Sequence, residues 1–203
     1  TSQTQRFCWR QQSTNIQIVS SRNIMSSTII AMVGDSGSGK THASLYLQEK
    51  YGWNAIVSYT TRQKRKSEKN GREHWFVTED DMPDKSKMCA YTLFGDHHYW
   101  TEWNQFQTLF TSVYVIDEKG LIGLKSKEQT PICFNLITVK IKRDKKDGID
   151  SDRLERDKGR TNLSDDFYDY IINNNGTLEE YHKKLDQLVT KIMEGNNGNT
   201  NDR

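Results

Sequence analysis

Three observations predict an α/β fold in which a parallel sheet lies between two layers of helices. Short runs of β-branched residues alternate with helical patterns along the chain, and this alternation is typical of parallel sheets covered by helices. A glycine-rich loop joins the first of these runs to the first helical pattern. The length of 203 residues suits one domain with inserts.

Five short apolar runs are the predicted strands, because β-branched residues dominate them and polar residues bound them. They cover residues 28–33, 55–58, 112–117, 134–141 and 169–173. Helices are predicted over residues 40–51, 118–127 and 178–193. In the last helix the apolar positions repeat at helical spacing, at Leu178, Tyr181, Leu185, Leu188 and Ile192.

Two charged segments interrupt this alternation and are too long to be ordinary connections. We therefore expect a core of residues 27–58 and 108–194, an insert at residues 59–107, and a lid at about residues 142–165. The polar ends, residues 1–26 and 195–203, are predicted to be a disordered leader and tail. Met25 stands just before the first strand and is a candidate natural start, which would make the leader an extension.

Charge and cysteine content narrow the class of protein. The chain has 29 basic and 27 acidic residues, and a protein that coats nucleic acid is usually more basic than this. The three cysteines form no C-x-x-C pair, which favours a reducing compartment. No apolar run reaches the length of about 18 residues that a membrane span needs. We therefore predict a cytoplasmic protein without a membrane or nucleic-acid partner.

The glycine-rich loop GDSGSGKT, Gly34–Thr41, fits the pattern G-x-x-x-x-G-K-[ST] between a strand and a helix. In this loop the backbone N–H groups turn inward toward phosphate oxygens. The predicted ATP-binding residues are Asp35, Ser36, Gly37, Ser38, Gly39, Lys40 and Thr41. Lys40 would reach the β- and γ-phosphates, and Thr41 would offer its hydroxyl to Mg²⁺. The motif predicts the P-loop NTPase fold, although a glycine-rich turn before a helix is the structural alternative.

A basic run follows, SYTTRQKRKSEKNGREHWFV at residues 58–77. Arg62 and Arg65 are three residues apart, so both can present planar guanidinium groups to one phosphate. The other basic residues of the run are expected to face solvent, as charged loops usually do. They are Lys64, Lys66, Lys69 and Arg72.

The order S-x-T-T-R-x-x-R-x-x-E-x-x-G-x-x-(aromatic)-x-F-V in this run resembles the nucleotide-binding segment of the guanylate kinase family. The resemblance continues at FGDHHYWT (94–101), VIDEKG (115–120) and FYDYIINNNGTLEE (167–180). It covers about residues 28–193. It implies a P-loop kinase with a small mixed insert that binds a nucleoside monophosphate (NMP), an arginine-bearing lid, and ATP and Mg²⁺ as co-substrate and metal.

The resemblance also implies roles for single residues of the acceptor site. Arg62, Arg65 and Tyr99 would hold the phosphate of the acceptor, and Glu68 would orient the two arginines. Ser58 and Asp117 would lie near its base, although Asp117 could also simply cap the following helix.

Other implied roles concern the donor and the lid. Asn173 resembles the asparagine near the adenine of the donor. Arg143, Arg153, Arg156 and Arg160 are the candidate lid arginines. Of these we expect Arg153, which is followed by the leucine of the family pattern, and Arg156 to be catalytic together with Lys40 and Arg62.

The chain departs from the family pattern at the acceptor site. His74 stands where a tyrosine is expected, and a histidine donates best to a phosphate when it is protonated. Counting back from Tyr99, a glutamate that reads the base would fall at Ala90, and the first acid of D-I-D falls at Val115. Guanine N–H groups need acceptors, because a buried donor without a partner costs about 1–3 kcal/mol. We therefore expect relaxed or altered base choice.

The predicted activity is phosphoryl transfer from ATP to a nucleoside monophosphate, with GMP or dGMP favoured, giving ADP and the diphosphate. The predicted partners are small nucleotides, and the protein would be a monomer or a homodimer. Three alternatives remain open at this point. They are a kinase for a sugar phosphate such as ribose 1,5-bisphosphate, a non-enzymatic binding module, and an ATPase acting on nucleic acid that uses VIDE (115–118) as its acidic motif.

Overall fold

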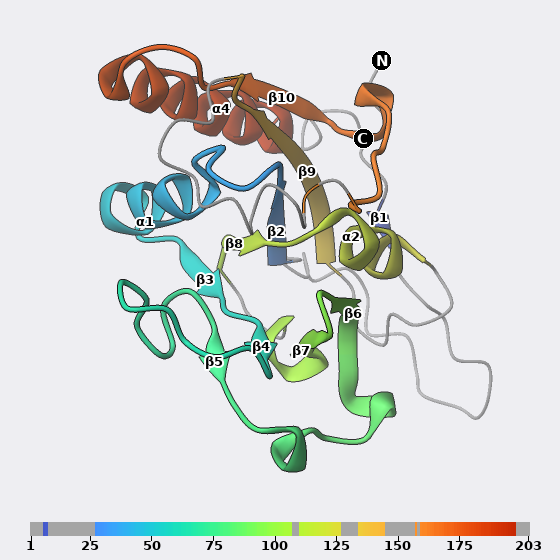
Figure 1. Ribbon diagram of the computed structural model, residues 1–203. Coiled ribbons are helices and arrows are strands. Elements are labelled where there is room, and N and C mark those ends of the chain that lie inside the picture. Colours follow the sequence, from blue (N-terminus) through green and yellow to red (C-terminus); the bar gives the residue numbers. More distant parts are fainter. Residues whose placement is uncertain are drawn as a thin grey trace, which may run out of the picture.

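A six-stranded sheet forms the middle layer of the computed structural model (Figure 1). The structure describes residues 6–7, 27–106, 110–126, 134–144, 157 and 159–197. The strand order is β1-β9-β2-β8-β3, and β10 also pairs with β9. All pairings are parallel except that of β1 with β9. The strands are β1 (Arg6–Phe7), β2 (Ser27–Val33), β3 (Asn54–Ile56), β8 (Ser112–Val115), β9 (Phe134–Lys142) and β10 (Tyr170–Asn173).

Helices and the insert cover the two faces of this sheet. Helices α1 (Lys40–Tyr51) and α4 (Leu178–Asn197) pack on the face that Ile30 and Met32 of β2 present. Helix α2 (Glu118–Lys125) and part of the insert pack on the opposite face, formed by Ile29, Ala31 and Val33. Because both faces are covered, every residue of β2 is buried, as expected for a central parallel strand.

The insert forms a second, smaller sheet below the first in Figure 1, with the order β5-β4-β7-β6. Its strands are β4 (Tyr59–Thr60), β5 (Trp75–Phe76), β6 (Met88–Phe94) and β7 (His97–Glu102). The pairing of β4 with β5 is parallel and the other two are antiparallel, so the sheet is mixed, as predicted. Short 3₁₀ turns cover Glu79–Asp81, Lys85–Lys87, Trp103–Phe106 and Asp165–Phe167.

The predicted α/β fold is confirmed, with small differences at the ends of elements. Strands β3 and β8 end two residues earlier than predicted, because residues 57–58 and 116–117 turn toward the site described below. Helix α2 ends at Lys125, where Ser126 caps it.

Both predicted disordered ends contribute some ordered residues. In the predicted leader, Arg6–Phe7 pairs with β9, and in the predicted tail, α4 continues to Asn197. The other residues of both segments, and residues 145–156 and 158 of the predicted lid, lie outside the described residues.

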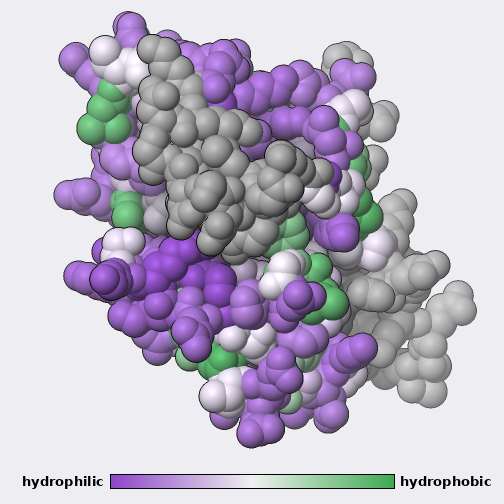
Figure 2. All heavy atoms as spheres, viewed as in Figure 1, coloured by the Kyte–Doolittle hydropathy of each residue, from purple (hydrophilic) through white to green (hydrophobic). Residues whose placement is uncertain are grey.

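The surface shown in Figure 2 is mostly hydrophilic, with hydrophobic residues in small separate patches. Among the described residues, no helix has the length and apolar character needed to cross a membrane.

Candidate active site

The P-loop connects the end of β2 to the first turn of α1. Gly39 caps α1 with a φ of 105°, which side chains rarely adopt, and a Cβ there would lie 2.6 Å from Asn174 Nδ2. Lys40 Nζ donates to the carbonyls of Gly34 and Asp35 at 2.5 and 2.7 Å. The lysine therefore folds over the carbonyls of its own loop and holds its charge at the centre of the loop.

Burial, and next the nearby Arg160 guanidinium, lower the pKa of Lys40 to about 7. An anion bound in the loop would favour the protonated form again, because opposite charge stabilises the ammonium group. A phosphate that enters the loop would therefore be attracted by the ammonium group of Lys40 and would stabilise its charge.

Two side chains from the C-terminal part of the chain hold the loop. Asn174 Nδ2 donates to the Ser38 carbonyl at 2.8 Å, and Tyr181 Oη donates to the Gly39 carbonyl at 3.1 Å. Asn173, the residue expected near the donor base, is exposed at the end of β10, and its carbonyl accepts from Lys184. Sequence reasoning missed Asn174, since three consecutive asparagines leave the register open.

The described part of the predicted lid touches the P-loop and α2. The carboxylate of Asp157 accepts from the Ser36 backbone N–H at 2.8 Å and from the Ser36 hydroxyl at 3.1 Å. Arg160 Nη2 and Nε donate to Glu118 Oε2 at 2.7 and 3.1 Å, and Glu118 is buried. Of the candidate lid arginines, Arg160 lines the same pocket as Lys40, and Arg143 Nη1 donates to the Gly37 carbonyl of the P-loop at 3.4 Å. Arg153 and Arg156, predicted to be catalytic, lie outside the described residues.

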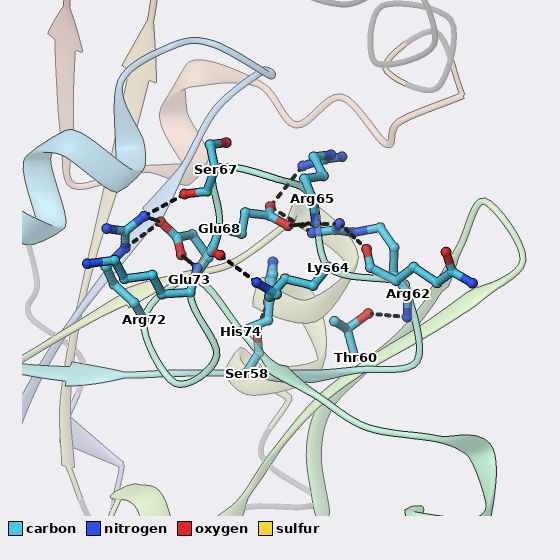
Figure 3. Close-up of polar contacts among 12 residues, drawn as sticks. Ser58, Thr60, Arg62, Lys64, Arg65, Ser67, Glu68, Arg72, Glu73 and His74 are labelled. Atoms are coloured by element: carbon cyan, nitrogen blue, oxygen red, sulfur yellow. Dashed lines mark hydrogen bonds and ion pairs between the residues drawn. The ribbon is translucent and has the colours of Figure 1, made fainter.

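Arg62, Arg65 and Glu68 form one ion-pair cluster, which Figure 3 shows with Glu68 between the two arginines. Glu68 accepts from Arg62 Nη1 and Nη2 at 3.0 and 2.9 Å and from Arg65 Nη1 at 3.1 Å. Burial acts against the charges, but these hydrogen bonds raise the pKa of Arg62 and lower the pKa of Glu68 to about 2. The cluster therefore holds two guanidinium groups on one carboxylate and keeps an excess of positive charge.

His74 lies next to this cluster and shares a hydrogen bond of 2.8 Å between its Nδ1 and Ser58 Oγ. Its ring meets the ring of Tyr99 edge-on at 5.6 Å. Burial, and next the Arg62 charge, lower the pKa of His74 to about 4. Burial first, and then the neighbouring guanidinium groups, disfavour the protonated imidazole, which is the form that would donate best to a phosphate.

Asp117 caps α2, and it also lines a pocket. The cap and a place near the base of the acceptor, the two roles considered from the sequence, are therefore compatible in geometry. Its Oδ1 accepts from the Gly120 N–H at 2.6 Å, and its Oδ2 accepts from the Thr92 hydroxyl at 2.9 Å. Ala90 and Val115, the positions where carboxylates were missing, line the same pocket. Ala90 has a φ of 52°, which is rare for alanine.

These parts meet in one pocket of about 190 Å³. It is lined by the predicted residues Ser36, Lys40, Ser58, Arg62, Arg65, His74, Tyr99 and Asp117, and by Arg160. A neighbouring pocket of about 410 Å³ is lined by Thr41 and other P-loop residues together with Arg65, Glu68 and His74. Of the other predicted residues, Gly37 and Gly39 line this second pocket, and Asp35 and Ser38 are in the P-loop itself.

The described residues form no closed protein cage for a metal ion. Among the described residues, no three or more His, Cys, Asp or Glu side chains gather in a way that could hold a metal ion. Thr41 lines the second pocket beside Lys40, and this fits Mg²⁺, which usually takes few protein ligands and the rest from phosphates and water.

The family model of guanylate kinase matches residues 26–192. The chain belongs to the guanylate kinase family. Relatives include the guanylate kinase of Protochlamydia amoebophila, 32% identical over 107 residues, which are 49% of this chain and 54% of the relative. The guanylate kinase of Fusobacterium nucleatum is 26% identical over 168 residues, which are 77% of this chain and 83% of the relative.

The fold agrees with this family membership. The crystal structure of guanylate kinase from Anaplasma phagocytophilum matches with a TM-score of 0.60 at 18% identity, covering 84% of this chain and 86% of that one. In sequence, the chain spans about half the length of several curated relatives that it matches. The share is 54% for the guanylate kinase of Protochlamydia amoebophila and 53% for that of Chlamydia caviae. Among guanylate kinase family members, this chain is therefore a divergent one.

Proposed function

We propose that this protein transfers the γ-phosphoryl group of ATP to a nucleoside monophosphate, giving ADP and the nucleoside diphosphate, with GMP or dGMP as the favoured acceptor. One observation carries the proposal: a single pocket is lined by Lys40 of the P-loop and by the Arg62 and Arg65 cluster. A donor phosphate on the first and an acceptor phosphate on the second would face each other across that pocket.

The residues around the pocket can do the work that this transfer needs. The acceptor phosphate is already a nucleophile, so positioning and charge neutralisation provide most of the catalysis. Arg62 and Arg65, held by Glu68, would fix the attacking phosphate. Lys40 and Arg160 would neutralise the charge on the group in transfer, since both line the same pocket. Arg153 and Arg156 remain proposed contributors to this neutralisation.

The P-loop would bind the donor with its backbone N–H groups and with Thr41, which would hold Mg²⁺. When bound, the metal would lower the negative charge that the incoming nucleophile must approach. Ser36 would give up its contact with Asp157 to a phosphate oxygen, because both need the same N–H and hydroxyl hydrogens.

The lining of the pocket supports a nucleoside acceptor rather than a sugar phosphate. Part of the wall is formed by apolar and aromatic side chains, including Phe94, Trp100, Val115 and Ile116. Such a surface suits the flat face of a base, which a sugar phosphate lacks.

Two features speak against a pure binding module and against an ATPase acting on nucleic acid. A module that only binds has no use for a P-loop with its lysine in place, and here Lys40 faces the acceptor cluster across one pocket. The acid of VIDE that a nucleic-acid-dependent ATPase would use to activate water is Glu118, and Glu118 is paired with Arg160.

A turnover panel tests the proposal. The protein is incubated with ATP, Mg²⁺ and each ribo- and deoxynucleoside monophosphate in turn, and ADP release is followed. We expect acceptor-dependent turnover, which Lys40→Ala abolishes while the far-UV circular dichroism and the thermal midpoint stay close to those of the parent. Turnover with none of the monophosphates, or stimulation by DNA or RNA alone, would reject the proposal.

A further inference from the structure

The hydrogen bond between Thr92 and Asp117 sets the polarity of the pocket wall that faces the acceptor. Thr92 is buried, and its strand β6 shifts register against β7 between Cys89 and Thr92. Such a bulge redirects the side chains that follow it. Here the Thr92 hydroxyl reaches across 25 positions of the chain to donate to Asp117 Oδ2 at 2.9 Å.

This bond uses the only hydrogen of the hydroxyl. A threonine hydroxyl has one hydrogen and two lone pairs, and an ionised carboxylate only accepts. Asp117 Oδ1 receives the Gly120 N–H and Oδ2 receives the Thr92 hydrogen, so each oxygen keeps a lone pair free for a ligand. The pair therefore presents acceptors and no donor to the pocket.

The other two carboxylates among the described lining residues are bound to charged or P-loop groups. Glu118 accepts from Arg160, and Asp157 accepts from Ser36. Ala90 and Val115 carry no polar side-chain atoms, so they add neither donors nor acceptors from their side chains. Ser58, Lys119 and Thr161 also bring polar groups to the pocket, and the Ser58 hydroxyl is engaged with His74. Among the carboxylates that line the described pocket, Asp117 with its bond from Thr92 is our candidate for the choice among bases.

We propose that Thr92 is a positioning and specificity residue: by donating to Asp117 it fixes the orientation of the carboxylate and keeps its own hydrogen away from the ligand, and the acceptors so placed select nucleoside monophosphates whose base presents an exocyclic amino group. The inference rests on the proposed function. Guanine, adenine and cytosine carry such a group, whereas uracil, thymine and hypoxanthine carry a carbonyl or a hydrogen at the corresponding place. A carbonyl facing Asp117 would meet a negative charge with no hydrogen between them, which disfavours its binding.

Two pairs of acceptors isolate the amino group. GMP and IMP differ only in the 2-amino group, and CMP and UMP differ in an amino group against a carbonyl. We expect the parent protein to bind and use GMP better than IMP, and CMP better than UMP, by about tenfold or more, as for one hydrogen bond to a charged group. Equilibrium binding by titration calorimetry and the KM and kcat of each acceptor measure these ratios.

Substitutions at Thr92 and Asp117 then show whether the acceptor ratios depend on the hydrogen-bonding groups of this pair or on its shape. In Asp117→Asn the amide oxygen can still cap α2, while Nδ2 donates to Thr92 and frees the threonine hydrogen for the ligand. We expect the CMP-to-UMP ratio to fall at least tenfold in this variant. Thr92→Val keeps the shape but removes the hydrogen bond that orients Asp117, so it should lower both ratios several-fold, mainly through the acceptor KM. Thr92→Ser restores the hydroxyl and should return the ratios toward the parent values.

The outcomes are distinguishable once thermal midpoints show that the variants fold. Unchanged ratios in Asp117→Asn, or equal ratios in Thr92→Val and Thr92→Ser, would overturn the role of this pair while turnover of monophosphates continued. Absence of turnover with every monophosphate in the parent protein would overturn the proposed function itself, and this inference with it.

Discussion

Removing the charge of Glu68 tests whether this carboxylate holds Arg62 and Arg65 together and stabilises the folded protein. In Glu68→Gln the side chain keeps its shape but loses the charge that pairs with Arg62 and Arg65. Hydrogen bonds lower the pKa of Glu68 from 4.5 to about 2, against the effect of burial. A tenfold change in an ionisation constant corresponds to about 1.4 kcal/mol, so the carboxylate contributes about 3 kcal/mol to the free energy of unfolding.

The matched control is Glu73→Gln, which lies in the same loop (Figure 3). Glu73 pairs with Arg72, whose side chain is 36% exposed, whereas the side chain of Arg62 is 8% exposed. A pair with one exposed partner contributes about 1 kcal/mol or less, because water screens it and solvates the arginine that remains, although the Glu73 side chain itself is 13% exposed. Denaturant unfolding at pH 7 should therefore show a loss of about 3 kcal/mol for Glu68→Gln and less than about 1 kcal/mol for the control.

The pH dependence of unfolding gives a second readout of the same group. Because the pKa of Glu68 is lower in the folded protein, its stabilisation is fully present above about pH 4.5 and is lost as pH falls toward 2. Glu68→Gln should not show the loss of folding free energy that protonation of Glu68 causes in the parent between pH 4.5 and 2. Equal losses for Glu68→Gln and Glu73→Gln at pH 7, together with the same acid dependence in Glu68→Gln as in the parent, would refute the reasoning.

Two further predictions concern the residues next to the phosphates. Asp157→Asn should lower the KM for ATP several-fold, because the carboxylate that accepts from Ser36 would no longer compete as an anion with a donor phosphate; an unchanged or higher KM would contradict this. With the pKa of His74 lowered to about 4, the acceptor KM should not follow a histidine titration between pH 6 and 8, and folding stability should fall as pH drops from 6.5 toward 4. A KM that rises through the histidine range in the parent and is flat in His74→Tyr would show a protonated histidine instead.

The parts of the site that sequence reasoning located are those with a local pattern. The P-loop and the run from Ser58 to His74 place their residues by fixed spacing within one loop each. The P-loop pattern identified Lys40, the spacing of Arg62 and Arg65 suggested a phosphate site, and the family resemblance added Glu68. The core strands were also predictable, since both faces of the sheet are buried and β-branched residues accumulate there. Strands β4 and β5 have two residues each and are below what periodicity can detect.

The parts that sequence reasoning missed depend on contacts between distant segments. Ser36 and Asp157 are 121 positions apart, and Thr92 and Asp117 are 25 apart, so no spacing rule connects them. The charge of His74 is set by the guanidinium groups packed around it and by burial, neither of which is visible in a single sequence. The predicted lid holds several arginines in one charged run, and only the fold indicates that Arg160 reaches Glu118.

The central claim is that Lys40 and the arginine cluster bring two phosphates together for direct transfer. Phosphorus NMR of a mixture of the protein, ATP, Mg²⁺ and GMP tests it most directly, because it follows both nucleotides at once. The account predicts that the resonances of ADP and GDP grow together in equal amounts, and that Arg62→Ala and Lys40→Ala each suppress both. ADP appearing with inorganic phosphate while GMP stays unchanged would contradict the account, as would GDP formation that survives the loss of Lys40.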